Sequence, residues 1–229
     1  MDPRSDEARL KFFGRRKGRS LKPSQQGILD QRLPVYALDP EAMPKNPREL
    51  FIPSVDSVQM EIGFGSGEHL VAQAQANPTV GYIGCEPFIN GVVKLVRDLD
   101  KAKVNTVRVY PDDARHVLDV LPDGCLDQVF VLFPDPWPKA RHRMRRFIGP
   151  DNLPRLARVI RPGGYLRCAT DHPDYLEWML LHIGACSDFI WTAQRPGDWL
   201  NRPQDQPPTR YETKALAGRP HYLQFQRRD

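Results

Sequence analysis

The chain has 229 residues, of which 40% are apolar, and this length suits one α/β domain with short extensions. Lysine and arginine number 33 against 28 acids, which gives a formal charge of +5 and an isoelectric point near 9.1. The longest clean apolar run, residues 129–133, is far too short to cross a bilayer. The first residues lack the apolar core of a signal peptide, so we expect a cytoplasmic protein.

The cysteines and histidines show no spacing typical of a metal site or a disulfide framework. Cys85, Cys125, Cys168 and Cys186 form no C-x-x-C pair, and the six histidines are scattered. We interpret the thiols as small hydrophobic groups in a reducing compartment, and we expect no metal. The sequence does not distinguish a monomer from a homodimer.

Positive charge is concentrated in two segments of the chain. Residues 9–22 hold seven basic residues and no acid, and residues 139–167 hold nine basic residues with Asp151 as their one acid. Such clustering indicates a polyanionic partner, although composition alone fits a solubilising surface equally well.

The predicted elements begin after a basic, Pro-rich and weakly periodic segment. We expect residues 1–50 to form a partly mobile arm and lead-in, and residues 51–229 to form the main domain. The predicted strands are 58–62, 82–85, 107–110, 129–133 and 165–169. The predicted helices are 68–76, 88–99, 114–121, 151–160 and 174–185. This alternation predicts a doubly wound, mostly parallel sheet covered on both faces.

The C-terminal third departs from this alternation. Residues 162–164, Pro-Gly-Gly, predict a turn that launches the fifth strand, and Asp171 is expected to cap the following helix. Residues 189–192 and 221–226 are extended in pattern, with a long Pro-rich loop over 195–219 between them. A loop of that length in a compact domain is more often functional than not.

Three glycines lie between the first predicted strand and its helix, at Gly63, Gly65 and Gly67. Glycines there allow a ligand to approach bare backbone, and the helix N-terminus offers free N–H groups to an anionic group. Glu86 ends the next strand, where a carboxylate can bind ribose hydroxyls. A dinucleotide enzyme would share these features.

The spacing of this motif argues against a dinucleotide. The glycines follow G-x-G-x-G instead of G-x-G-x-x-G, and Glu61 precedes the first glycine by two residues. This form resembles the first motif of S-adenosylmethionine-dependent methyltransferases. The resemblance implies that Glu61 and the loop hold the methionine part of the cofactor, and that Asp113 meets the adenine amino group. The neighbouring Asp112 is interpreted as a solvated loop acid, and strand-end acids that only cap helices remain the structural alternative.

A proline-braced loop, residues 133–138, follows the fourth predicted strand. Its prolines stiffen the backbone around Asp135, a rigid acceptor suited to the N–H groups on the edge of a guanine. Trp137 could stack on the base; the structural alternative is a rigid corner around a buried tryptophan. The adjacent residues 139–146 carry five formal positive charges and His142, which indicates phosphate binding.

These features together resemble the bacterial tRNA (guanine-N7)-methyltransferase family, which belongs to the class I methyltransferases. The match extends over residues 15–228, and the Phe-Pro-Asp-Pro-Trp loop with its basic tail is its most specific part. Further matching residues are Ala169, Thr170, Asp171, Thr209, Arg210, Tyr211 and Glu212. The resemblance implies a seven-stranded sheet with an antiparallel C-terminal strand pair. Family members often carry lysine where this chain has Met144.

The resemblance also implies an activity and residue roles. The activity is methyl transfer from S-adenosyl-L-methionine to N7 of a guanine in the variable loop of tRNA, with Asp135 as the catalytic residue. The implied cofactor-binding residues are Glu61, Gly63, Gly65, Gly67, Glu86, Asp113 and Asp135. The implied substrate-binding residues are Lys139, Asp171, Thr209, Arg210, Tyr211 and Glu212. The implied RNA-backbone contacts are Arg141, His142, Arg143, Arg145 and Arg146.

Other classes of protein remain as alternatives at this point. Another S-adenosylmethionine-dependent RNA base methyltransferase would share most of the same residues. An NAD-dependent oxidoreductase would leave the proline-braced loop and the basic run unexplained. A non-catalytic RNA-binding module is disfavoured by the strand-end acids, and a small-molecule methyltransferase is disfavoured by the positive segments.

Overall fold

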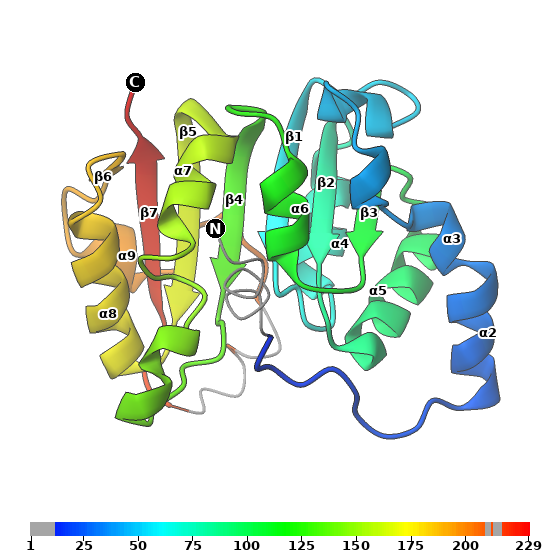
Figure 1. Cartoon of the computed structure of the whole chain (residues 1–229), viewed down its shortest axis with the longest axis horizontal. Coiled ribbons are helices and arrows are strands. Elements are labelled where there is room, and N and C mark those ends of the chain that lie inside the picture. Colours follow the sequence, from blue (N-terminus) through cyan, green and yellow to red (C-terminus); the bar gives the residue numbers. More distant parts are fainter. Residues whose placement is uncertain (1–11, 209–211, 213–216) are drawn as a thin grey trace, which may run out of the picture.

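The computed structural model describes residues 12–208, 212 and 217–229 of the chain. Seven strands form one sheet in the order β3-β2-β1-β4-β5-β7-β6 (Figure 1). The strands are β1 (Ser57–Ile62), β2 (Val80–Cys85), β3 (Val107–Tyr110), β4 (Leu126–Leu132), β5 (Ile160–Thr170), β6 (Phe189–Trp191) and β7 (His221–Arg227). The first five are parallel, and β7 runs antiparallel to both β5 and β6. The predicted sheet and its antiparallel C-terminal pair are confirmed.

Helices cover both faces of this sheet. One face carries α6 (Ala114–Val120), α7 (Leu153–Val159) and α8 (Pro173–Gly184), and the other carries α4 (Glu68–Ala76) and α5 (Ile89–Ala102) (Figure 1). The shorter elements are α2 (Pro23–Gln31), α3 (Leu33–Tyr36), η1 (Pro40–Ala42), η2 (Pro47–Leu50), η3 (Ala140–Arg145) and α9 (Gly197–Leu200). No described helix is long and apolar enough to span a membrane.

The central strands are buried on both faces, and this explains their unbroken apolar character. Val129, Phe130 and Val131 of β4 are at most 1% exposed, as expected of a parallel strand between two helical layers. On α5, one apolar stripe that includes Val92 and Leu95 packs against β2 and β3. Burial of these side chains fixes which face of each element points inward.

The register brings the carboxyl ends of the five parallel strands to one edge of the sheet. Ile62 lies beside Cys85, and Cys85 lies beside Tyr110. On the other side of β1, Leu132 at the end of β4 lies beside Ala169 of β5. The loops that follow these strands therefore meet at one edge, where open α/β sheets bind their ligands.

Several local predictions differ from the structure. Residues 162–164 do not form a turn before the fifth strand, because β5 begins at Ile160 and continues through a glycine with φ of 72° at Gly163. Asp171 does not cap α8; His172 holds the N-cap position, and Asp171 accepts instead from the backbone N–H of Ala217 at 3.1 Å. Contacts distant in sequence decided both outcomes.

The N-terminal region packs more closely than its weak periodicity indicates. Residues 23–50 contain α2, α3 and two short 3-10 helices, and α2 packs on α5. Before α2, the backbone of Arg16 accepts from Ile89 at 3.0 Å, and the backbone N–H of Gly18 donates to Asn90 at 2.8 Å. This segment therefore lies against the N-terminus of α5.

Candidate active site

The glycine loop after β1 requires glycine at three positions. Gly63, Gly65 and Gly67 have φ of 73°, 56° and 79°, a region that side chains rarely adopt. Gly67 is the N-cap of α4, so the free N–H groups of that helix point into the loop. A Cβ at Gly91 of α5 would lie 2.0 Å from the carbonyl oxygen of Gly65, so α5 supports the loop by close backbone contact.

Glu86 lies directly beyond β2 and is only 9% exposed. One carboxylate oxygen accepts from the backbone N–H of Gly65 at 2.8 Å, and the other accepts from that of Phe88 at 2.8 Å. Burial raises the pKa of Glu86, while these two hydrogen bonds oppose the rise. The carboxylate thus joins the end of β2 to the glycine loop and faces the cavity that this loop lines.

Glu61 is buried under the glycine loop and pairs with a residue that the sequence did not single out. His69 Nδ1 lies 2.8 Å from a carboxylate oxygen of Glu61, and both side chains are less than 5% exposed. The His69 ring also meets Phe130 edge-on at 4.8 Å. One oxygen of Glu61 is therefore engaged within the protein. His69 lies eight residues further along the chain, and no spacing rule indicates this contact.

Asp113 follows β3 and is the N-cap of α6. It accepts from the backbone N–H of Arg115 at 3.0 Å, and both of its oxygens receive hydrogen bonds from the Arg115 guanidinium. The neighbouring Asp112 pairs with Arg16 of the N-terminal segment at 2.8 Å. Asp113 is only 4% exposed and still lines the cavity, so it acts as a helix cap whether or not it also binds a ligand.

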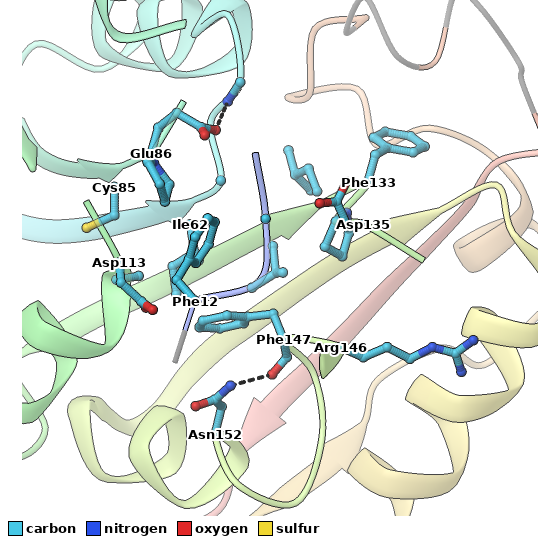
Figure 2. A pocket seen from close by; sticks show the side chains of 18 of the residues that line it. Phe12, Ile62, Cys85, Glu86, Asp113, Phe133, Asp135, Arg146, Phe147 and Asn152 are labelled. Carbon is cyan, nitrogen blue, oxygen red and sulfur yellow. Dashed lines mark hydrogen bonds between the residues drawn. The ribbon is translucent and has the colours of Figure 1, made fainter. Parts of the chain in front are cut away.

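The three acids and the glycine loop line one cavity of about 630 Å³. This volume lies within the range of small-molecule and cofactor sites. On the opposite side the cavity is lined by the loop after β4, and Figure 2 shows Glu86 and Asp135 on facing walls. Phe12, Phe13 and Arg15 of the N-terminal segment also line it, which the sequence did not indicate.

The loop after β4 holds Asp135 in a constrained backbone. Phe133 and Trp137, which flank it, have φ of 49° and 43°, conformations that cost energy for residues other than glycine. Within the described part of the chain the Asp135 carboxylate makes no hydrogen bond, and it faces the cavity. Desolvation at the cavity wall nevertheless raises the pKa of Asp135.

The basic run after this loop is divided between surface and interior. Lys139 and Arg141 are exposed, and Arg145 lies between two aromatic rings, 4.4 Å from Phe13 and 5.1 Å from Trp137. Partial desolvation, followed by the nearby positive charges of Arg145 and Arg141, lowers the pKa of His142.

Two arginines of the run contact α8 instead of solvent alone. Arg143 forms an ion pair with Asp174 at 2.6 Å and keeps 43% of its side chain exposed. The Arg146 side chain is 0% exposed and pairs with the same carboxylate. The prediction that Arg146 contacts the RNA backbone is therefore revised, because a guanidinium buried in the protein does not present itself to phosphate.

The predicted substrate-binding residues of the C-terminal region are only partly described. Thr209, Arg210 and Tyr211 lie outside the described residues. Glu212 accepts from Arg202 at 3.0 Å. That contact lies within the C-terminal loop, whereas the bond from the backbone N–H of Ala217 to Asp171 brings the loop to the carboxyl end of β5.

Comparisons with known proteins define the class first. A family model described as "Putative methyltransferase" matches residues 56–223. The fold is similar to that of an rRNA methylase from Streptococcus thermophilus, with a TM-score of 0.52 and 10% identity over 76% of this chain and 87% of that one. A 16S rRNA (adenine(1408)-N(1))-methyltransferase from Catenulisporales acidiphilia gives a TM-score of 0.52 and 17% identity over 84% and 92% of the two chains. The chain has a methyltransferase fold.

The curated relatives then identify the family. A tRNA (guanine-N(7)-)-methyltransferase of Rhodospirillum rubrum is 51% identical over 95% of this chain and 88% of its own length. One of Azorhizobium caulinodans is 48% identical over 94% of both chains. This chain belongs to the tRNA (guanine-N(7)-)-methyltransferase family.

Proposed function

We propose that this enzyme transfers a methyl group from S-adenosyl-L-methionine to N7 of a guanine in the variable loop of tRNA, forming 7-methylguanosine in the cytoplasm. The observation that carries the proposal is the single cavity lined on one side by the glycine loop and Glu86, and on the other by Asp135. Relatives that match nearly the whole chain and are named for this activity support it.

The residues on one wall fit the cofactor. Gly63 has no atom near the place where a Cβ would stand, so its bare backbone borders open space, as close approach of a ligand requires. The two carboxylate oxygens of Glu86 can accept hydrogen bonds from the ribose hydroxyls in place of those that they now accept from the protein backbone. Asp113 lies at the end of β3, where the adenine amino group would be met. The bound cofactor supplies an electrophilic methyl group on a sulfonium.

The other wall fits a guanine. Two acceptor oxygens of Asp135 suit the N1–H and N2–H₂ donors of the guanine edge, and this pairing would leave N7 to be directed at the methyl group. N7 carries a lone pair at neutral pH, so no residue has to remove a proton before attack. The task of the protein is alignment, and Asp135 is an orienting group instead of a general base.

The surface beside this wall fits tRNA. Lys139 and Arg141 are exposed next to the loop, and their charges are available to phosphate. Since N7 lies in the deep major groove of A-form RNA, a duplex guanine would be hard to reach. A guanine in a loop, or one displaced from its stack, meets the requirement.

The test is methylation of a defined tRNA transcript with methyl-labelled S-adenosylmethionine, followed by N7-specific strand cleavage to locate the product. The matched control is a transcript in which 7-deazaguanosine replaces the modified guanosine, because this change removes N7 alone. Label in the normal transcript and none at that position in the control are expected. Equal labelling of both transcripts would contradict N7 as the acceptor, and no labelling of any tRNA would contradict the proposed function.

A further inference from the structure

Arg146 is the last residue of the basic run, yet its side chain is fully buried. Arg146 borders the cavity, and in Figure 2 its guanidinium extends toward helix α8. Its Nε donates to the carbonyl oxygen of Pro136 at 2.8 Å, and its Nη1 donates to the backbone carbonyl of Asp174 at 3.3 Å. Its Nη2 completes an ion pair with the Asp174 carboxylate. One guanidinium therefore joins the loop after β4 to the start of α8.

The guanidinium is also held between aromatic rings of that helix. Its central carbon lies 4.9 Å from the ring of Tyr175 and 5.2 Å from the ring of Trp178. Both rings are fixed in turn, because the Tyr175 hydroxyl accepts from the backbone N–H of Ile148 and the Trp178 Nε1 donates to the carbonyl of Ile148. The anchor for Arg146 is thus a rigid part of the protein core.

The loop that Arg146 holds needs such an anchor. Pro136 directly follows Asp135, and the positive φ values at Phe133 and Trp137 are kept only where the surroundings enforce them. Arg146 donates its hydrogen bond to the carbonyl of Pro136, which lies between Asp135 and Trp137 in the chain. Loss of this hydrogen bond would let the loop relax and would change the direction of the Asp135 carboxylate.

We propose that Arg146 is a positioning residue that anchors the Asp135 loop to α8 and so aligns Asp135 with the base. The proposal rests on the proposed function of the cavity. Lysine cannot replace Arg146, because a single ammonium group lacks the planar fork that donates to Pro136 and Asp174 together while stacked between rings.

The test compares Arg146→Lys with Arg155→Lys, a control in which a partly exposed arginine paired with Asp119 at 2.6 Å undergoes the same change. We expect Arg146→Lys to lower kcat about 10- to 100-fold at saturating tRNA and cofactor, since small misplacement of a reacting group has effects of this size. Binding of S-adenosylhomocysteine and the salt dependence of tRNA affinity are expected to stay unchanged. The control is expected to keep its kcat.

Limited trypsinolysis measures the loop independently of activity, because Lys139 and Arg141 follow it directly in the chain. Faster cleavage at these residues in Arg146→Lys than in the Arg155→Lys control is expected. Unchanged kcat with unchanged cleavage would overturn the proposal. So would unchanged kcat with a reduced salt slope, since that result would make Arg146 a phosphate contact.

Arg146→Ala adds a chemical rescue. It leaves a space between Pro136, Asp174 and the two rings, into which added methylguanidinium can bind. Methylguanidinium is expected to restore both kcat and trypsin resistance in this variant and to leave both unchanged in the wild type. A folded variant that methylguanidinium does not restore would contradict the anchoring role of Arg146. If the Arg146 variants do not fold, Asp174→Asn weakens the same anchor from the α8 side, and wild-type kcat and cleavage in that variant would overturn the proposal.

The trypsin comparison also separates this proposal from the proposed function. A wild-type enzyme that fails to methylate any tRNA would refute the function. The cleavage rates of the Arg146 and Arg155 variants would still decide whether Arg146 anchors the loop.

Discussion

The two walls of the cavity are held in place in different ways. On the proposed cofactor wall, two acids each accept from a backbone N–H two residues further along the chain, Glu86 from Phe88 and Asp113 from Arg115, and Glu86 also accepts from Gly65 of the glycine loop. On the proposed substrate wall, the loop around Asp135 is held by distant residues, through the bonds of Arg146 to Pro136 and Asp174.

This difference indicates that the two walls respond differently to change. A wall built from strand ends and helix caps keeps its shape wherever the sheet forms. A wall that depends on an arginine and a helix far along the chain can be displaced without disturbing the sheet. We therefore expect that turnover and cofactor affinity can be altered separately, and the following changes test that expectation.

Asp135→Ala is expected to have the largest effect. It removes the group that orients the base, so turnover should fall by at least about 100-fold, the scale of a misaligned reactant. Affinity for S-adenosylhomocysteine should change little, because the opposite wall is intact. Single-turnover rates and calorimetric binding measure the two quantities. Asp123→Ala, at an exposed surface ion pair, is the control, and full activity in Asp135→Ala would remove Asp135 from the site.

Glu86→Ala is expected to weaken cofactor binding by about 1–3 kcal/mol, because it removes the acceptor for buried donors. Affinity for tRNA in the absence of cofactor should not change. Exposed Glu49→Ala is the control, and both constants are measured by titration. An unchanged cofactor dissociation constant would show that Glu86 only fastens the glycine loop to the end of β2.

Gly91→Ala tests the support beneath the glycine loop. The added methyl would lie 2.0 Å from the Gly65 carbonyl oxygen, so α5 or the loop must move. Overpacking of this kind costs about 1–3 kcal/mol, and we expect part of it as lost affinity for S-adenosylhomocysteine. Gly27→Ala in α2, where no atom lies within 4 Å of the added methyl, is the matched control. Equal affinities in the two variants would contradict a supporting role for α5.

The raised pKa of Asp135 predicts an acid limb in the pH profile of kcat/KM. The carboxyl must be ionised to accept two N–H donors, so activity is lost as pH falls through this pKa. Because the pKa is raised, the loss should begin at a higher pH than for an ordinary aspartate. The rate should then fall about tenfold per unit of pH. The pH profile of the residual activity of Asp135→Asn should lack this acid limb. If the variant keeps the limb, the limb arises from the titration of another group.

Arg141→Ala is expected to have the smallest effect. Loss of one phosphate contact should reduce the slope of log affinity against log salt by about 0.7–0.9. The modified position in tRNA should not move, because the base pocket is unchanged. Arg155→Ala, which removes a surface ion pair with Asp119 of α6, is the control. A shifted site of modification with an unchanged slope would mean that Arg141 reads shape or sequence.

The sequence by itself determined the sheet, the glycine loop and the strand-end acids. Periodic apolar runs and turn residues are local signals, and the carboxyl ends of parallel strands must share an edge. The predicted bounds of β3 and of α4 agree with those observed, and Glu86 and Asp113 line the cavity where strand order places them.

Only the tertiary structure decided which charged side chains face outward. The basic run looks uniform in sequence, yet Arg141 is exposed while Arg146 is buried against Asp174. Nor does any local pattern join His69 to Glu61, or Asp171 to the C-terminal loop. Burial and ion pairing depend on which distant elements pack nearby, and that is set only when the whole sheet and its helices have assembled.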